Sequence, residues 1–441
     1  MINWVHVLLT NAPTILISGV IILVAQVVYQ VVTDMFPDED GVKFSIENVS
    51  VIAVAIKELF VRLFISIAES DGFDIFSPAV KTTALILVVG AWMIRRDSPI
   101  YMMSFATFKA PEDWKCDQDE IMEMMKRQKC FTQESLNFMR RILDRSGTGP
   151  ATAWPPGITQ CLKPKEGSLD PTDHMLTDRS IDASRKEAQI VISDIVKRAL
   201  KEANVKPREI DVLIINCSLF SPTPSLCAMV VSEFGMRSNI ETYNLSGMGC
   251  SASLISVDLA KKLLGRKGSR KALVVSTEII TPNLYHGNDR GFLIQNTLFR
   301  CGGAAIVLSN NWLDGRRAWY KLLHTVRVQG SGEASYQCVF ETEDEHGERG
   351  VRLSKDIVKV AGKTMEKNFT MLGPSVLPVS EQAKVVWTII VRYVLKSMGN
   401  ALGKATADKL PKVKPYVPDF KRGIDHFCIH AGGRAVIDGK L

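Results

Sequence analysis

The sequence predicts an α/β fold that follows two apolar segments near the N-terminus. Three observations support this. Short continuous apolar runs alternate with segments in which apolar residues recur at helical spacing, a pattern typical of strands and helices packed in layers. One unit of helix, proline and strand occurs twice along the chain. The first 96 residues also contain two long runs that are almost free of charge.

Composition narrows the functional classes. Hydrophobic residues make up 46% of the 441 residues, which is high for a soluble body alone, and the net charge is +7. The basic excess is diffuse and no zinc-finger spacing accompanies it, so a nucleic-acid partner is not expected. Nine cysteines are dispersed without a C-x-x-C pair, which predicts reduced thiols in a body that faces the cytosol.

Residues 1–110 are predicted to form a membrane anchor with two transmembrane helices. Residues 12–32 carry no charge and are long enough for about one bilayer crossing. A cleaved signal peptide is the alternative, although a basic start is missing. The second run, 75–94, is interrupted only by Lys81 and ends in Arg95 and Arg96. The loop after the first run is acidic, so the positive-inside rule places the remainder of the chain in the cytosol.

Elements of the α/β body follow in order. Residues 111–175 form a connecting segment with one helix and a proline-rich loop. Residues 176–312 form a first α/β half that opens with a helix near Asp182. The run 210–217 is short and continuously apolar, which is typical of a buried parallel strand. Further strands are expected at 243–245, 272–276 and 304–309, and a helix at 251–264.

A second half is expected over residues 313–441. A helix at 385–398 and a proline-rich loop precede an apolar run at 424–430, which resembles the unit around 210–217. Duplication of one α/β unit is the thiolase architecture. The first copy continues for about a hundred residues beyond its strand, whereas 17 residues follow Ile424. The second half is therefore expected to be truncated at its C-terminal side.

Cys250 is the main candidate nucleophile. Gly247 and Gly249 permit a tight turn before it, and the helix expected at 251–264 would place the thiol at a helix N-terminus. Free N–H groups there favour a thiolate. The helix carries apolar residues on most faces, so we expect it to be buried and Cys250 to lie in a dry pocket suited to acyl-thioester chemistry. A small structural cysteine after a glycine turn is the alternative.

Three histidines are further candidates. His426 and His430 bracket an apolar strand end and precede Gly432 and Gly433, which is typical of a loop at the edge of an active site. A metal pair would require both on one helix face, which the strand-like pattern does not favour. His324 lies in an expected strand over 322–326, where a structural role is equally compatible.

The chain resembles plant-type 3-ketoacyl-CoA synthases, the condensing enzymes of fatty acid elongation in the thiolase and chalcone synthase-like superfamily. The motifs include Asn-Leu-Ser-Gly-Met-Gly-Cys at 244–250, Ser-Thr-Glu at 276–278, Gly-Asn-Asp-Arg at 287–290 and His-Phe-Cys-Ile-His-Ala-Gly-Gly-Arg at 426–434. The resemblance extends over roughly residues 98–438.

This resemblance implies a reaction and its site. An acyl group is transferred from CoA to Cys250, malonyl-CoA loses carbon dioxide, and the resulting carbanion attacks the thioester. His430 matches the family histidine that steadies the enolate, and His426 and His324 match further family histidines. No metal or organic cofactor is implied. Expected partners are acyl-CoA, malonyl-CoA, the endoplasmic reticulum membrane, a second copy of the chain and other elongase subunits.

One departure bears on activity. The family's active-site asparagine lies beyond the Gly-Gly-Arg motif, whereas none of the eleven residues after His430 is asparagine. We therefore expect exposed apolar surface and weak or absent activity for the chain as written. A catalytically inactive, membrane-bound family member that acts as a binding or scaffold subunit is the alternative to the enzyme. A soluble polyketide synthase is disfavoured by the two apolar runs.

Overall fold

In a computed structural model of the chain, the described residues are 99–402 (without 166, 169, 171, 172, 266 and 267), 411, 413–430, 432 and 434. The chain divides into two compact units, residues 1–97 and 98–441. Both predicted membrane spans lie outside the described residues. Of the helices within the described ranges, none has both the length and the apolar character that crossing a bilayer requires.

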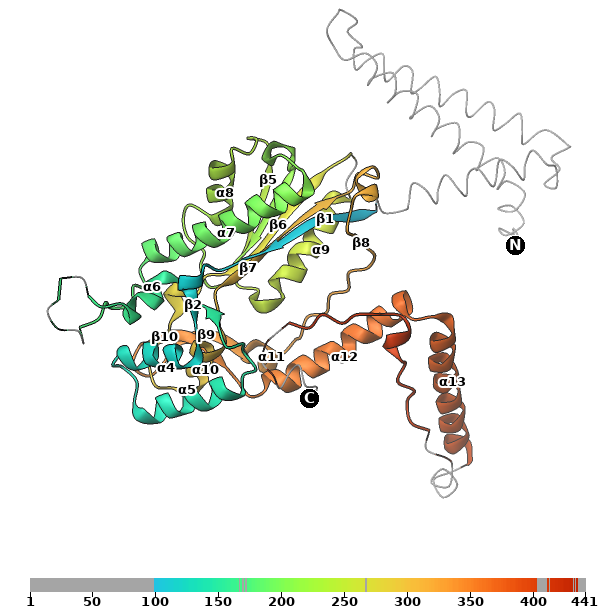
Figure 1. Cartoon of the computed structure of the whole chain (residues 1–441). Helices are drawn as coiled ribbons and strands as arrows, with labels where there is room; N and C mark the ends of the chain where they lie inside the picture. The colour runs from blue at the N-terminus through green and yellow to red at the C-terminus, as the bar shows by residue number, and fades with distance from the viewer. Residues whose placement is uncertain are drawn as a thin grey trace, which may run out of the picture. The chain divides into compact units, whose positions relative to one another are not determined.

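A six-stranded sheet forms the centre of the second unit (Figure 1). The strand order is β5-β4-β6-β7-β1-β8. Strand β4 runs parallel to β5 and β6, whereas β7 is antiparallel to β6 and β1 is antiparallel to both β7 and β8. The strands are β1 Ile100–Thr107, β4 Val212–Asn216, β5 Glu241–Leu245, β6 Lys271–Glu278, β7 Gly302–Ser309 and β8 Tyr320–Leu322.

Helices cover both faces of this sheet. Helix α7 (Ile181–Ala203) packs on one face with α8 (Leu226–Phe234), and α9 (Ala252–Leu264) packs on the other. Strand β4 shows why its residues form a continuous apolar run. Leu213 and Ile215 belong to the core beneath α7, whereas Val212 and Ile214 belong to the core beneath α9. Alternate side chains point to opposite faces, so a strand buried on both faces must be apolar throughout.

The predicted first half is confirmed in its main elements. The strands expected at 210–217, 243–245, 272–276 and 304–309 correspond to β4, β5, β6 and β7, and β4 is parallel to its neighbours. Helix α7 begins two residues earlier than a cap at Asp182 would place it, because the Ser180 side chain is the cap and accepts a hydrogen bond from the Ala183 N–H (3.2 Å).

Strand β1 differs from the expectation, because the sequence analysis assigned residues 100–107 to the N-terminal anchor. They form a strand of the body, paired with β7 on one side and β8 on the other. Ser104, in the middle, is buried and donates a hydrogen bond to the Ala199 carbonyl (2.7 Å). A polar residue satisfied in this way interrupts the apolar pattern without weakening the strand.

A second apolar cluster lies beside the sheet. It joins α4 (Gln118–Arg127), α5 (Gln133–Arg145) and α10 (Arg290–Leu298). The short helix α6 (Pro156–Thr159) contributes Ile158 to the same cluster. Two small antiparallel pairs border it. They are β2 (Lys115–Cys116) with β3 (Thr152–Ala153), and β9 (Val339–Glu343) with β10 (Arg349–Leu353).

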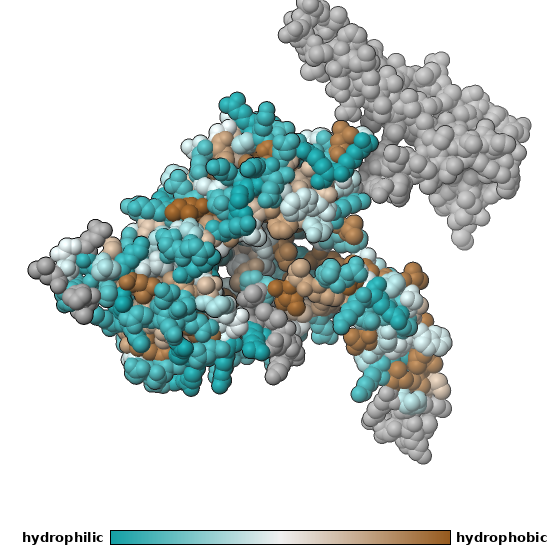
Figure 2. Space-filling model, viewed as in Figure 1, coloured by the Kyte–Doolittle hydropathy of each residue, from teal (hydrophilic) through white to brown (hydrophobic). Residues whose placement is uncertain are grey.

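The second half departs from the prediction. A short helix, α11 (Glu333–Tyr336), precedes the long helices α12 (Ile357–Val376) and α13 (Val379–Leu402). Helix α13 confirms the helix expected at 385–398, and Figure 2 shows hydrophobic side chains gathered on its surface. The strand expected at 424–430 is wrong, because these residues form no ladder with any described segment. A strand needs backbone partners to be stable, and apolar sequence alone does not supply them.

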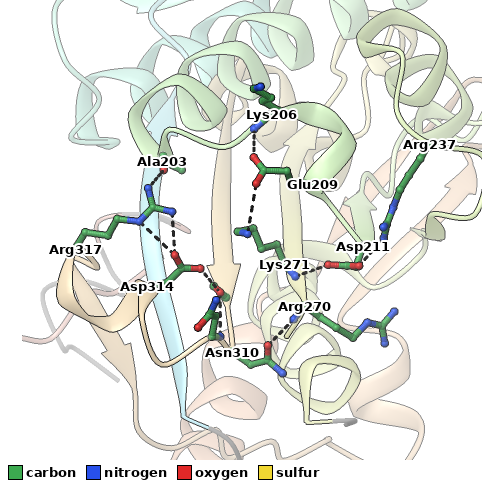
Figure 3. Close-up of polar contacts among 12 residues, drawn as sticks. Ala203, Lys206, Glu209, Asp211, Arg237, Arg270, Lys271, Asn310, Asp314 and Arg317 are labelled. Carbon is green, nitrogen blue, oxygen red and sulfur yellow. Dashed lines mark hydrogen bonds and ion pairs between the residues drawn. The ribbon is translucent and has the colours of Figure 1, made fainter. Parts of the chain in front are cut away.

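A polar network closes the end of the sheet at which its parallel strands begin (Figure 3). Asp211, just before β4, accepts a hydrogen bond from the Lys271 N–H (2.7 Å) and pairs with Arg237 (2.5 Å). Asn310, just after β7, accepts from the Arg270 N–H (2.6 Å). These contacts fix the starts of β4 and β6 and the end of β7 relative to one another.

Candidate active site

The opposite end of the sheet holds the candidate site, where β4, β5 and β6 finish. In open α/β sheets, the crevice outside the carboxyl ends of the strands is where ligands bind. Three loops meet there. They follow Asn216 of β4, Leu245 of β5 and Glu278 of β6. The loop after β5 carries the glycine turn and Cys250.

The glycine turn has the predicted geometry. Gly247 and Gly249 have φ angles of +68° and +62°, a region that residues with a side chain rarely occupy. Cys250 then lies in a 3₁₀ turn, Gly249–Ser251, which leads directly into α9. The Gly249 N–H donates a hydrogen bond to the Ser218 hydroxyl (3.0 Å), which ties the turn to the loop after β4.

Glu278 organises the neighbouring loop. Its carboxylate accepts hydrogen bonds from the backbone N–H groups of Ser218 (2.9 Å to the nearer oxygen) and Leu219 (2.9 Å). The Cys217 thiol also lies 3.7 Å from the same carboxylate. Ser218 in turn holds Gly249, so Glu278 positions the turn that presents Cys250.

The charge state of Cys250 differs from the expectation. Partial loss of water around its thiol raises the pKa of Cys250 above its ordinary value. The nearby Glu278 carboxylate raises the pKa further. Both effects oppose the thiolate that the helix N-terminus is expected to favour. Cys250 precedes α9, which begins at Ala252, and it faces a negative charge.

The surroundings of Cys250 are also more open than predicted. Cys250 is exposed, whereas the sequence predicts that it lies in a dry pocket. Helix α9 buries only one face, which includes Ser256, Ala260 and Leu264, whereas Leu254 is 74% exposed. The expectation that this helix is buried holds for one face only, because Val257 and Leu259 are half-buried and Leu254 is exposed.

A buried amide clamps α9 to the sheet. Asn216, at the end of β4, donates to the Ser256 hydroxyl (3.1 Å) and to the Val275 carbonyl (3.2 Å). Its oxygen accepts a hydrogen bond from the Ser276 hydroxyl (3.0 Å). Every polar atom of this buried side chain is thus satisfied, and the helix behind Cys250 is held at a fixed height on β4 and β6.

The three predicted histidines lie in exposed positions. His324 follows β8, which ends at Leu322, so the strand expected over 322–326 is confirmed only at its start. The next residue, Thr325, donates a hydrogen bond to Asp258 of α9 (2.8 Å), which fixes this segment against the nucleophile helix. His426 and His430 lie in irregular structure, so their spacing of four does not place them on one helix face.

The structure does not bring the four predicted site residues together. Among the described residues, no hydrogen bond or ring contact joins Cys250 to any of the three histidines, and no cluster of three or more possible metal ligands occurs. The histidine roles stay predictions. The segment 413–424 is instead held to α13. The buried Glu381 of that helix accepts hydrogen bonds from the Tyr416 hydroxyl (2.7 Å) and the Asp419 N–H (3.1 Å).

Glu278 and Ser218 are the functional residues that the sequence analysis missed. Both belong to motifs that it quoted or adjoined, since Glu278 ends Ser-Thr-Glu and Ser218 follows Asn216 and Cys217. A carboxylate directly after a buried parallel strand was the available signal. Two basic residues that follow α9 lie away from this site. Arg270 pairs with Glu241 (2.5 Å), and Lys271 starts β6, at the far end of the sheet from Cys250.

Comparisons with known proteins agree with this architecture. The family described as "FAE1/Type III polyketide synthase-like protein" matches residues 92–394. A solved polyketide synthase, PKS-I from the brown alga Ectocarpus siliculosus, superimposes with a TM-score of 0.50 at 17% identity, covering 64% of this chain and 74% of that one. At this identity the similarity shows the shared thiolase and chalcone synthase-like fold alone.

Curated relatives are more similar in sequence. The chain is 41% identical to 3-ketoacyl-CoA synthase 5 of Arabidopsis thaliana over 391 residues, which cover 88% of this chain and 74% of the relative. It is 42% identical to 3-ketoacyl-CoA synthase 11 of the same plant over 391 residues, covering 88% and 71%. The glycine turn that carries Cys250 lies within the residues that match this family. The chain therefore belongs to the FAE1/type III polyketide synthase-like family and, within it, to the plant-type 3-ketoacyl-CoA synthases.

Proposed function

We propose that the chain is a very-long-chain 3-oxoacyl-CoA synthase, an acyltransferase that condenses a long-chain acyl-CoA with malonyl-CoA in fatty acid elongation. The observation that carries the proposal is the position of Cys250. It lies on a glycine turn at the carboxyl end of three parallel strands, with its thiol open to solvent. The names of the relatives support the same reaction.

The reaction has two stages. In the first, the Cys250 thiol loses its proton and its sulfur attacks the acyl-CoA thioester, so an acyl-cysteine forms and CoA leaves as the thiol. In the second, malonyl-CoA loses carbon dioxide and its α-carbon attacks the acyl-cysteine. The new carbon–carbon bond releases the Cys250 sulfur, which regains a proton. The product is a 3-ketoacyl-CoA that is two carbons longer than the acyl group.

Because the pKa of the Cys250 thiol is raised, the first stage needs a base that removes its proton. A thiol is a weak nucleophile until it is deprotonated, and Glu278 opposes that step by its charge. We propose that His430 assists here and donates a hydrogen bond to the enolate oxygen in the second stage, with His426 and His324 in supporting roles. This requires the segment 424–430 to lie close to Cys250. His426 and His430 are exposed, so no buried contact of either side chain would have to break.

The proposed setting is the endoplasmic reticulum membrane, with the catalytic body facing the cytosol. The apolar runs 12–32 and 75–94 and the basic pair Arg95 and Arg96 support it. A homodimer and contacts with other elongase subunits belong to the same proposal. An inactive scaffold member is not favoured, because the relatives carry the names of synthases.

Elongation by the full chain in microsomes tests the proposal. With a long-chain acyl-CoA and labelled malonyl-CoA, we expect a labelled 3-ketoacyl product. Cys250→Ala should lower its formation by more than about a thousandfold, because the covalent stage is lost. Cys338→Ala is the matched control, since this half-buried cysteine directly precedes β9 and lies outside the candidate site. Product formation by Cys250→Ala at the level of this control would refute the nucleophile.

A further inference from the structure

Exposed aromatic side chains occur at the β8 edge of the sheet, outside the candidate site. Strand β8 forms this edge, and the turn before it continues the same surface. Five apolar side chains there are between 49% and 66% exposed. Two basic residues are interspersed among them. We call this set the aromatic rim: Trp312, Leu313, Arg316, Trp319, Tyr320, Lys321 and Leu323.

The aromatic rim is held rigidly. Asp314, in the middle of the turn, is buried and accepts hydrogen bonds from the Ser309 hydroxyl (2.7 Å) and from Arg317 (2.9 Å) (Figure 3). The backbone N–H of Trp319 donates a hydrogen bond to the Met102 carbonyl (2.9 Å). The Trp319 ring packs edge-on against the Phe105 ring, with 5.3 Å between the ring centres. The exposed rings are therefore displayed by fixed backbone and do not belong to a loose loop.

The charges of the aromatic rim are those of a surface that meets anions. The Arg316 guanidinium lies over the Trp312 ring, 5.6 Å from its centre, and neither Arg316 nor Lys321 forms an ion pair in the described part of the chain. Tryptophan and tyrosine beside lysine and arginine are enriched where proteins meet the head groups of a membrane.

Chain connectivity indicates which partner is within reach. Ile100 and Tyr101 of β1 pair directly with Leu322 and Lys321 of β8. The apolar run 75–94 ends six residues before Ile100, and six residues span at most about 20 Å even when fully extended. If that run crosses a bilayer, Ile100 lies within that distance of the end of the run, and Ile100 and Tyr101 pair with the strand that carries Tyr320 and Lys321. Arg95 and Arg96 between them add to the positive charge.

We propose that the aromatic rim docks the catalytic body on the anionic cytosolic surface of the membrane. The rings enter the head-group layer while Arg316 and Lys321 meet acidic phospholipids. A second copy of the chain fits less well, because a twofold interface would bring the basic pairs of both copies into one patch that has no acidic residue of the aromatic rim to oppose them. The inference rests on the membrane location within the proposed function and adds a contact outside the anchor.

Site-specific photocrosslinking of the full chain in vesicles of phosphatidylcholine and phosphatidylserine tests this. With benzoylphenylalanine at Tyr320 or Trp312, we expect a phospholipid adduct in the peptide that contains the label. Ser232 is the matched control position, since it is exposed on α8 beside β5, the opposite edge of the sheet. Arg316→Glu with Lys321→Glu should lower the adduct yield by about fivefold or more.

Each outcome decides a separate point. A chain that resists carbonate extraction but forms no lipid adduct at 320 or 312, or forms as much at 232, overturns the docking surface alone. An adduct with the mass of a second copy assigns the aromatic rim to a dimer and also overturns it. A chain that carbonate removes overturns the membrane location itself. Elongation is measured in a separate assay. A chain that forms no labelled 3-ketoacyl product but still gives the lipid adduct refutes the proposed reaction and leaves the docking surface standing.

Discussion

The two ends of one sheet carry opposite kinds of electrostatics. At the end where the parallel strands begin, carboxylates meet cations. Asp211 pairs with Arg237 (Figure 3), and Glu241 pairs with Arg270. At the end where they finish, Glu278 accepts hydrogen bonds from backbone N–H groups and from the Cys217 thiol, all of them neutral, and lies near the Cys250 thiol. The first arrangement balances charge and stabilises the fold. The second leaves a negative charge beside the reactive sulfur, which is typical of sites selected for chemistry.

Among the substitutions that distinguish the two ends of the sheet, Glu278→Ala should cause the largest loss of elongation. It leaves the N–H groups of Ser218 and Leu219 without their acceptor, so the loop that holds Gly249 loses its position. We expect elongation to fall on the order of 100-fold, because small displacements near reacting atoms have effects of that size. Product formation from labelled malonyl-CoA measures it. Activity within about twofold of the unchanged chain would remove Glu278 from the site.

Asn216→Ala should have the next largest effect, and it acts on both properties. It removes three hydrogen bonds that clamp α9 to β4 and β6 and leaves Ser256 and Ser276 without this partner. We expect the free energy of unfolding to fall by about 2–3 kcal/mol, with a smaller loss of elongation than Glu278→Ala causes. Chemical denaturation of the purified chain measures it. An unchanged denaturation midpoint would show that α9 is held by its apolar contacts alone.

Asp211→Ala, at the opposite end, should reduce stability and leave chemistry unchanged. Its carboxylate is mostly buried and accepts from both Arg237 and the Lys271 N–H, so its loss should lower the free energy of unfolding by about 1–3 kcal/mol. Glu209→Ala is the control, because its pair with Lys271 is long (3.8 Å) and exposed. A loss of elongation by the folded Asp211→Ala chain would contradict the separation of the two ends.

The smallest predicted effect concerns the Cys250 thiol itself. Because burial and the Glu278 carboxylate raise its pKa, alkylation of Cys250 by iodoacetamide should still be accelerating at pH 9. Glu278→Gln keeps a hydrogen-bond acceptor but removes the charge, so the pKa falls and alkylation near pH 8 becomes about fivefold faster. Peptide mass spectrometry follows the rate. A plateau below pH 8 would mean that the thiolate is already the resting form.

The first half of the fold was predictable because its signals are local. A run such as 212–216 is apolar on both faces only when helices cover both sides of its sheet. The positive φ angles at Gly247 and Gly249 follow from the same kind of reasoning. Strand β1 was missed because its buried Ser104 resembles a surface residue until its partner, the Ala199 carbonyl, is known.

The candidate site was predictable only in part, because its electrostatics depend on neighbours distant in the chain. Cys250 stands out through its glycines, but the pKa of its thiol is raised by burial and by Glu278, which lies 28 residues later in the chain. A helix N-terminus favours a thiolate in isolation, whereas both of these effects oppose it. The strand expected at 424–430 fails for a similar reason, since a strand depends on backbone partners outside itself.

Acylation of the full chain tests the central claim most directly. Cys250 and Cys428 are the two exposed cysteines among the nine, so exposure alone predicts a mixture of adducts. After incubation with a long-chain acyl-CoA without malonyl-CoA, peptide mass spectrometry should place the acyl group on Cys250 and leave Cys428 free. Acyl-Cys428 with unmodified Cys250, or equal modification of both, would contradict the assignment of the nucleophile to the glycine turn at the end of the sheet.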